Sequence, residues 1–358
     1  MGDLVLVTGG SGYIVGWCIV ELLQRGYDVR ATIRTKGKEA LVTDAVATVV
    51  DPAGRLSFAV ADLTKPDGWA GAMRDVDYVL HVASPLGLLS NDPDALVATA
   101  RDGALNVLKA ATEAGVKRVV MTSAANAASP SSYATEGVTD ETLWTDADDP
   151  TLIPYRRSKT VAERAAWAFM VEHSMVEHSM AEHSMAEHGG ATEFVTVLPG
   201  AVFGPILTKD NIGSVGIIGR MVSGAMPGVP RIGLEIVDVR DLADIHVRAM
   251  ATPDAVGQRF LATGEFTWMR EIAETLHNGL GADGAKIATR QLPNFAVRLA
   301  ARFADKSLRE ITPSLGRRSR HTTEKAKRIL DWQPRPAAET VLDCARSLIA
   351  NDAISTRS

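Results

Sequence analysis

The sequence contains few of the residues that mark several protein classes. Its 358 residues include two cysteines, Cys18 and Cys344, which lie far apart and lack metal-ligand spacing. We therefore expect reduced thiols, a cytoplasmic location and no metal site. No run approaches the roughly 18–20 apolar residues that cross a bilayer, and no basic stretch precedes the first apolar segment. We expect neither a membrane span nor a leader peptide.

Excess positive charge is also missing. Lysine and arginine number 38 against 43 acidic residues, which gives a formal net charge of -5. This balance argues against a nucleic-acid surface and leaves a small molecule as the expected partner. The hydrophobic fraction of 46% is ordinary for a globular chain with a sizeable core. Its length indicates a main domain with a smaller partner, and both a monomer and a homodimer remain open.

Short apolar strands alternate with helical segments through the first half of the chain. We expect strands at about 4–8, 28–34, 56–61, 78–83, 118–123 and 194–198. Helices are expected near 12–25, 37–50, 93–114 and 151–170. This alternation predicts an α/β fold, a Rossmann-type doubly wound parallel sheet with helices on both faces.

Glycine and proline become dense after about residue 200, and the pattern changes. We expect residues 1–200 to form a dinucleotide-binding domain to which a returning segment at about 231–264 belongs. Residues 201–230 and 265–345 are expected to form a smaller C-terminal substrate lobe. In the returning segment, Asp241 could cap the helix that follows.

A pentapeptide repeats four times over residues 170–189, reading MVEHS, MVEHS, MAEHS and MAEHG. A histidine metal site is one reading. However, five residues advance a helix by about 500°, so successive histidines point some 140° apart. Metal-binding pairs on helices use spacings of three or four. We favour a tandem duplication that lengthened a helix end or loop.

Four glycines, Gly9, Gly10, Gly12 and Gly16, lie between the first strand and the first helix. Backbone N–H groups without obstructing Cβ atoms, above the positive end of a helix, bind phosphate well. In this strand–turn–helix context the pattern predicts a dinucleotide site.

The end of the second expected strand indicates which dinucleotide. It reads ATIRTKGK, with Arg34, Lys36 and Lys38 and no carboxylate for the ribose hydroxyls of NAD. Guanidinium and ammonium groups pair with the extra 2′-phosphate of NADP. We therefore expect NADP(H).

Tyr155 and Lys159 stand one helical turn apart in PYRRSKTVAER. Such a pair is common at surfaces by chance, so it becomes informative only beside other motifs. The chain carries VTGGSGYI near its start, ADLT at 61–64, HVASP at 81–85, DETLW at 140–144 and YRRSKTVAERAAW at 155–167. LPGAVFGP at 198–205 and VDVRDLADIHVRAM at 237–250 follow.

In this order the motifs resemble the extended short-chain dehydrogenase/reductases, in the branch of dihydroflavonol, cinnamoyl-CoA and microbial aldehyde/ketone reductases. The resemblance runs from about 3 to 345. It implies an NADPH-dependent carbonyl reductase in which Tyr155 protonates the carbonyl oxygen, while Lys159 holds the nicotinamide ribose and lowers the phenol's pKa.

The resemblance also implies contact residues. Those expected to meet the cofactor, besides Tyr155 and Lys159, are Gly9, Gly12, Tyr13, Ile14, Arg34, Lys38, Asp62, Leu63, Ala83, Ser84, Pro199, Gly200 and Val202. Leu86 and Phe203 are expected to line the substrate pocket. His81, in the fourth strand, is expected to be a satisfied interior or cofactor-side histidine.

Two positions depart from the family pattern. Val15 stands where the third glycine of TGxxGxxG belongs, with Gly16 beside it, and we expect looser helix–cofactor packing. The fifth strand of the family ends in T-S-S, whereas this chain reads MTSAANAAS, which aligns Ala124 with the substrate-binding serine. Ser123, the preceding residue, is the nearest candidate for the third catalytic residue. Neighbouring strand residues point to opposite faces, so Ser123 would need a backbone shift to take this role.

Three functions follow from these motifs. The main hypothesis is NADPH-dependent reduction of aldehydes or ketones to alcohols. A sugar-nucleotide epimerase or dehydratase would use the same fold, although DETLW and the cationic second-strand end argue against it. A catalytically impaired NADP-binding sensor or scaffold is the third, and Ala124 supports it.

Overall fold

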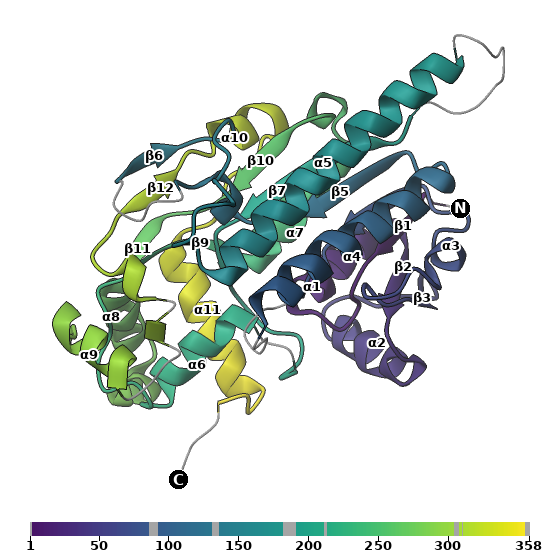
Figure 1. Cartoon of the computed structure of the whole chain (residues 1–358). Helices are drawn as coiled ribbons and strands as arrows, with labels where there is room; N and C mark the ends of the chain where they lie inside the picture. Colours follow the sequence, from purple (N-terminus) through teal and green to yellow (C-terminus); the bar gives the residue numbers. More distant parts are fainter. Residues whose placement is uncertain are drawn as a thin grey trace.

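Seven parallel strands form the centre of the protein in a computed structural model (Figure 1). The structure describes residues 2–85, 92–130, 136–181, 191–210, 213–303, 308–309 and 311–354, without the side chains of 174–181. The strand order is β10-β7-β5-β4-β1-β2-β3. The strands are β1 (Leu4–Val7), β2 (Asp28–Ile33), β3 (Leu56–Val60), β4 (Tyr78–His81), β5 (Arg118–Thr122), β7 (Glu193–Pro199) and β10 (Arg259–Ala262). The predicted Rossmann-type fold is confirmed.

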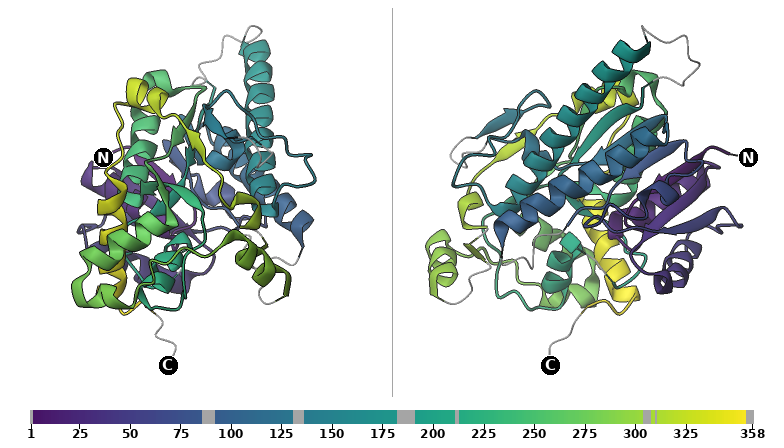
Figure 2. Two further views of the ribbon diagram at one scale, coloured as in Figure 1. Left: turned by 90° about the vertical axis from the view of Figure 1, so that its left-hand side faces the viewer. Right: turned by 45° about the vertical axis from the view of Figure 1, so that its right-hand side comes forward.

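Helices cover both faces of this sheet (Figure 2). On one face lie α1 (Tyr13–Gln24), α2 (Glu39–Ala47) and α7 (Val239–Ala251), and on the other α3 (Trp69–Ala72), α4 (Pro93–Glu113) and α5 (Pro154–Ala181). Residues of the central strands, such as Val5, Leu6 and Val7 of β1, are fully buried because helices cover both faces of the sheet. Because the strands are parallel, their carboxyl ends lie at one edge of the sheet, and ligands bind at this edge in folds of this class.

The segment expected to return to the sheet divides between two sheets. β10 joins the central sheet beside β7, as expected from RFLATG. In contrast, β9 (Gly233–Asp238) pairs with β8 (Ala201–Phe203) and β11 (Phe266–Trp268) in a separate three-stranded sheet. The chain passes from β7 through Gly200 into β8 and so carries the partner of β9 away from the central sheet.

The C-terminal part packs around an apolar cluster of its own. It contains α6 (Gly216–Val222), α8 (Met269–Gly279), α9 (Asn294–Phe303) and α11 (Ala337–Ala350), while α10 (Glu324–Leu330) packs on the main core. β12 (Ser319–His321) pairs with β6 (Gly137–Thr139), which joins this part to the segment after β5. The domain boundaries expected from the sequence stay a prediction.

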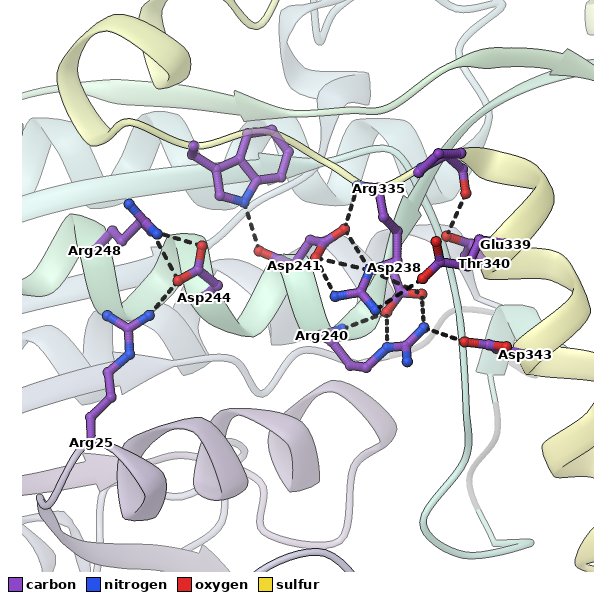
Figure 3. A network of polar contacts seen from close by, with 12 residues as sticks. Arg25, Asp238, Arg240, Asp241, Asp244, Arg248, Arg335, Glu339, Thr340 and Asp343 are labelled. Carbon is purple, nitrogen blue, oxygen red and sulfur yellow. Dashed lines mark hydrogen bonds and ion pairs between the residues drawn. The ribbon is translucent and has the colours of Figure 1, made fainter.

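A network of charges fixes α11 against α7 (Figure 3). Asp238, not Asp241, caps α7: its carboxylate accepts from the backbone N–H of Arg240 at 2.8 Å. Asp241 is the third residue of the helix and pairs with Arg335 at 2.7 Å. Arg240 bridges Asp238 and Asp343 of α11, each at 2.8 Å. The two parts of the chain are therefore joined by several charge-assisted hydrogen bonds.

α5 is long enough to include the start of the pentapeptide repeat. It runs through 28 residues to Ala181 and extends beyond the sheet (Figure 1). The ring of His173 stacks on Phe169 with centroids 5.6 Å apart. Residues 182–189 of the repeat lie outside the described residues. No described helix is both long and apolar enough to span a bilayer.

Candidate active site

The glycine-rich loop between β1 and α1 is held tightly against neighbouring strand ends. The N–H of Gly9 donates to Thr32 Oγ1 at 2.9 Å, and that of Gly10 to the Thr32 carbonyl at 2.6 Å. Gly9 has φ +86°, and a Cβ there would lie 2.9 Å from the Cβ of Ala83. Only glycine fits this conformation and this contact.

The N-terminus of α1 is free to bind an anion. Gly12 is its N-cap, and no side chain caps it. The backbone N–H groups of the first turn, which includes Tyr13 and Ile14, thus point out of the helix end with its partial positive charge. Tyr13 donates its hydroxyl to the Gly204 carbonyl at 3.0 Å, while Ile14 packs on the main core. This is the arrangement that binds a pyrophosphate.

The departure at Val15 is accommodated inside the protein. Val15 is buried in the main apolar cluster. A Cβ on Gly16 would lie 2.9 Å from Leu207 Cδ1, so the glycine at 16 lets the segment after β8 rest on α1. A pocket opens beside the loop, lined by Gly10–Tyr13, Gly16, α2 and residues 207, 208 and 210.

The ends of β2 and β3 bring Arg34 and Asp62 together. Arg34 is exposed directly after β2, and Lys38 precedes α2. Hydrogen bonds from the Thr64 backbone and hydroxyl lower the pKa of Asp62, with a smaller contribution from Arg34. Leu63 packs under Gly103 of α4. A cationic side chain therefore stands at this edge, as the sequence predicted.

We expect Arg34→Ser to weaken NADPH binding about 10–100-fold and to leave NADH binding nearly unchanged, because a hydrogen-bonded charge pair with the 2′-phosphate is lost. Fluorescence titration with each cofactor measures this difference. Arg270→Ser on α8, an exposed arginine far along the chain, is the control. Equal losses for both cofactors would contradict a 2′-phosphate contact at Arg34.

Tyr155 and Lys159 lie in the first turns of α5, which begins at Pro154. Lys159 is buried, with 7% of its surface exposed. Burial lowers the pKa of Lys159 to about 8, against the opposing charge of Glu163. Burial raises the pKa of Tyr155. This direction is opposite to the expected lowering, because burial removes water from the phenolate.

His81 ends β4 beside this pair. Its Nδ1 lies 2.9 Å from the Thr8 hydroxyl, which also accepts from the N–H of Ala83 at 3.0 Å. Burial, and then the charge of Lys159, lower the pKa of His81 to about 3. The imidazole is therefore neutral and hydrogen-bonded, as expected for an interior histidine. The effect of the Lys159 charge on His81 indicates that the two side chains lie close together. Ser84 follows a few residues after His81.

The structure does not place the Ser123 hydroxyl at the site. Ser123 Oγ donates to Glu163 Oε2 at 2.6 Å inside the protein. Thr122 Oγ1 is 2.7 Å from His246 Nε2 and is likewise engaged. Ala124 begins the 3₁₀ turn η3 (Ala125–Ala128) in extended conformation. The proposed role of Ser123 as a substrate donor therefore conflicts with its hydrogen bond.

The remaining predicted contacts follow β7. Pro199 ends this strand, and the N–H of Gly200 donates to the Ala262 carbonyl at 3.2 Å. A Cβ on Gly200 would lie 2.3 Å from the Glu235 carbonyl oxygen, so this turn also requires glycine. Val202 and Phe203 are buried in β8, and the Phe203 ring belongs to the apolar cluster rather than to a pocket wall. Leu86 lies outside the described residues.

Sequence reasoning missed two buried charged residues beside the site, Glu163 and Arg259. They pair at 2.9 Å. Glu163 stands four residues after Lys159, so helical spacing already placed both on one face of α5. Nothing in the sequence marked Arg259, which lies in β10. Within the described residues, no group of three or more His, Cys, Asp or Glu is placed to hold a metal ion.

Comparisons with known proteins agree with this architecture. Residues 5–262 match the model of the NAD dependent epimerase/dehydratase family. Dihydroflavonol 4-reductase of Zea mays is 30% identical over 74% of this chain and 71% of its own. Cinnamoyl-CoA reductase CAD2 of Medicago truncatula is 33% identical over 73% and 76%.

A solved structure shows the same fold. Yeast methylglyoxal/isovaleraldehyde reductase Gre2, complexed with NADPH, superposes with TM-score 0.79 at 23% identity, over 98% of this chain and 100% of that one. The chain belongs to the NAD dependent epimerase/dehydratase family, the extended short-chain dehydrogenase/reductases.

Proposed function

We propose that this protein is an NADPH-dependent reductase that converts small aldehydes or ketones to alcohols. The observation that carries the proposal is Lys159, a buried lysine whose pKa is lowered by burial and which stands one turn from Tyr155. A buried cation is costly unless it meets a partner. The ribose hydroxyls of a bound nicotinamide nucleotide would supply that partner.

The chain's own residues fit NADP(H). The loop at Gly9 and Gly12 is too tightly packed for a Cβ, the N-cap Gly12 has no side chain to cap α1, and Arg34 follows β2, where we expect the 2′-phosphate. The relative Gre2 is complexed with NADPH, which supports the same choice. Asp62, Leu63, Ala83, Ser84 and the turn at Pro199–Val202 remain the proposed further contacts.

Tyr155 is the proposed proton donor. The cofactor, when bound, supplies a hydride from C4 of its nicotinamide. Because burial raises the pKa of Tyr155, the phenol is protonated at neutral pH and can give its proton to the carbonyl oxygen as negative charge develops there. Lys159, which carries its charge below about pH 8, stabilises the phenolate that remains.

One observation favours a second function. Neither Ser123 nor Ala124 offers a free hydroxyl to the substrate oxygen, and a lost donor to a developing oxyanion costs about 10²–10³ in turnover. A protein that binds NADPH and reports its level, without turnover, would tolerate this loss.

The fold neighbours also include a UDP-glucose-4-epimerase, at 20% identity.

The test is NADPH oxidation at 340 nm with aromatic and aliphatic aldehydes, ketones and β-keto esters, followed by product analysis. We expect oxidation of NADPH in excess over NADH and formation of the alcohol. Tight NADPH binding with no turnover on any carbonyl would contradict the reductase and favour the sensor. Conversion of a nucleotide sugar without net cofactor consumption would indicate an epimerase.

A further inference from the structure

Glu163 connects α5 to three neighbouring strands. Its carboxylate accepts hydrogen bonds from Ser123 Oγ at 2.6 Å, from Thr196 Oγ1 at 2.8 Å and from Arg259 Nε at 2.9 Å. Ser123 follows β5, Thr196 lies in β7 and Arg259 in β10, and these strands are adjacent in the sheet. The carboxylate is fully buried, so all of its contacts are protected from water.

Arg259 extends the same anchor to the segment after β5. Its Nη1 donates to the carbonyls of Glu141 and Leu143, at 2.6 and 3.0 Å. Its Nη2 reaches the Ala127 carbonyl in η3 at 3.3 Å, and its guanidinium stacks on Trp144 at 3.6 Å from the ring centroid. The DETLW segment therefore closes around this guanidinium.

The anchor lies on the helical face that carries the reacting pair. Tyr155, Lys159 and Glu163 are spaced by four residues and so share one side of α5. A fixed carboxylate at Glu163 sets the rotation of α5 against the carboxyl ends of β5 and β7. Those ends are where the proposed substrate carbonyl would lie.

The same carboxylate acts on the charge of Lys159, one helical turn before it on α5. Two other groups face this lysine: His81 of β4, which is neutral, and Tyr155 on the same helix. Arg259 of β10 pairs with Glu163. On α4, the packed neighbour of α5, Asp94 pairs with exposed Arg157 instead. Burial lowers the pKa of Lys159, and Glu163 is the group that opposes this effect.

We propose that Glu163, held by Arg259, is a positioning residue for the reductase: it orients Tyr155 and Lys159 on α5 and keeps Lys159 charged. The inference rests on the proposed function of Tyr155 and Lys159. It also assigns Ser123 to this anchor rather than to the substrate. Glu163 touches neither substrate nor cofactor in this scheme and acts through Lys159.

The first experiment is the pH profile of kcat/KM for Glu163→Gln in the full chain. Loss of the anion lowers the pKa of Lys159 further, so the charged form disappears at lower pH. We expect the alkaline limb to move down by about one pH unit. If Glu163→Gln folds, binds NADPH and shows the same pH profile of kcat/KM as the wild type, the proposal is overturned.

Two further variants separate charge from geometry and from folding. Glu163→Asp keeps the anion but shortens its reach, so we expect the alkaline limb to stay while kcat falls about tenfold with little change in KM. This variant also serves if Glu163→Gln fails to fold. Ser123→Ala removes one hydrogen bond to Glu163 and keeps the Glu163–Arg259 pair, so we expect it to lower kcat less than Glu163→Asp does. Large loss in Ser123→Ala with a normal Glu163→Gln would make Ser123 the substrate donor and overturn the inference.

Cofactor affinity distinguishes failure of the inference from failure of the proposed function. If the wild-type chain reduces no carbonyl compound, the reductase proposal fails by itself. NADPH affinity against pH then still reports on Lys159, because its ammonium is the expected ribose contact. If the NADPH affinity of Glu163→Gln begins to weaken at a pH about one unit lower than that of the wild type, the proposed role of Glu163 is supported. Identical curves overturn it.

Discussion

Replacing Tyr155 by phenylalanine is expected to lower carbonyl reduction by about 10²–10⁴-fold, the usual contribution of a positioned proton donor. The side chain keeps its ring and its packing at the start of α5 and loses only the hydroxyl. NADPH affinity should change little, since Lys159 and the glycine-rich loop remain. Rates with saturating NADPH and a good carbonyl substrate, beside a fluorescence titration of the cofactor, measure both.

The matched control for this variant is Tyr78→Phe, which removes a hydroxyl from β4 far from α5. It should leave turnover within about twofold, as for most substitutions away from a site. If Tyr155→Phe retained wild-type kcat, the proton would come from another group, and the mechanism proposed for Tyr155 would be wrong.

Restoring the serine of the family pattern should have the second large effect. We expect Ala124→Ser to raise kcat by about 10²–10³, because a preorganised hydroxyl would stabilise the developing oxyanion. Ala124 has extended backbone at the end of β5, and its neighbour Ser123 stays bound to Glu163. The new hydroxyl is therefore not drawn into the existing anchor.

The control for that gain is Ala125→Ser, one residue further along and also buried. It adds the same group in η3 and should leave kcat unchanged. Equal rates in all three chains would show that turnover does not depend on a hydroxyl at 124. A gain of similar size in both variants would point to an effect on stability instead, which thermal unfolding of each chain would reveal.

The sequence predicted the central sheet well because its signals are local. Runs such as LVLV and YVL are apolar at successive positions, which is typical of strands covered on both faces. Gly9 and Gly12 were recognisable for a similar reason, since strand, turn and helix follow one another within a few residues. Tyr155 and Lys159 needed the surrounding motifs, because the pair by itself is unspecific.

What the sequence could not show depends on contacts between distant segments. The orientation of Ser123 is decided by Glu163, 40 residues further along the chain, and Glu163 is held in turn by Arg259, another 96 residues on. The helix cap at Asp238 rather than Asp241 depends on where the backbone of β9 turns into α7. β9 itself was assigned to the wrong sheet, because a strand pattern does not reveal its partner.

The length of α5 has a consequence for how this chain can vary. The reacting residues stand at its first turns, while the repeat begins at Met170 and continues the helix away from the sheet. A unit of five residues in helical conformation spans about 7.5 Å and turns by about 140°. Every unit of the repeat follows Tyr155 in the chain, so a change in copy number would leave Tyr155 and the first turns of α5 in place. Chains that differ only in copy number should then be equally good catalysts.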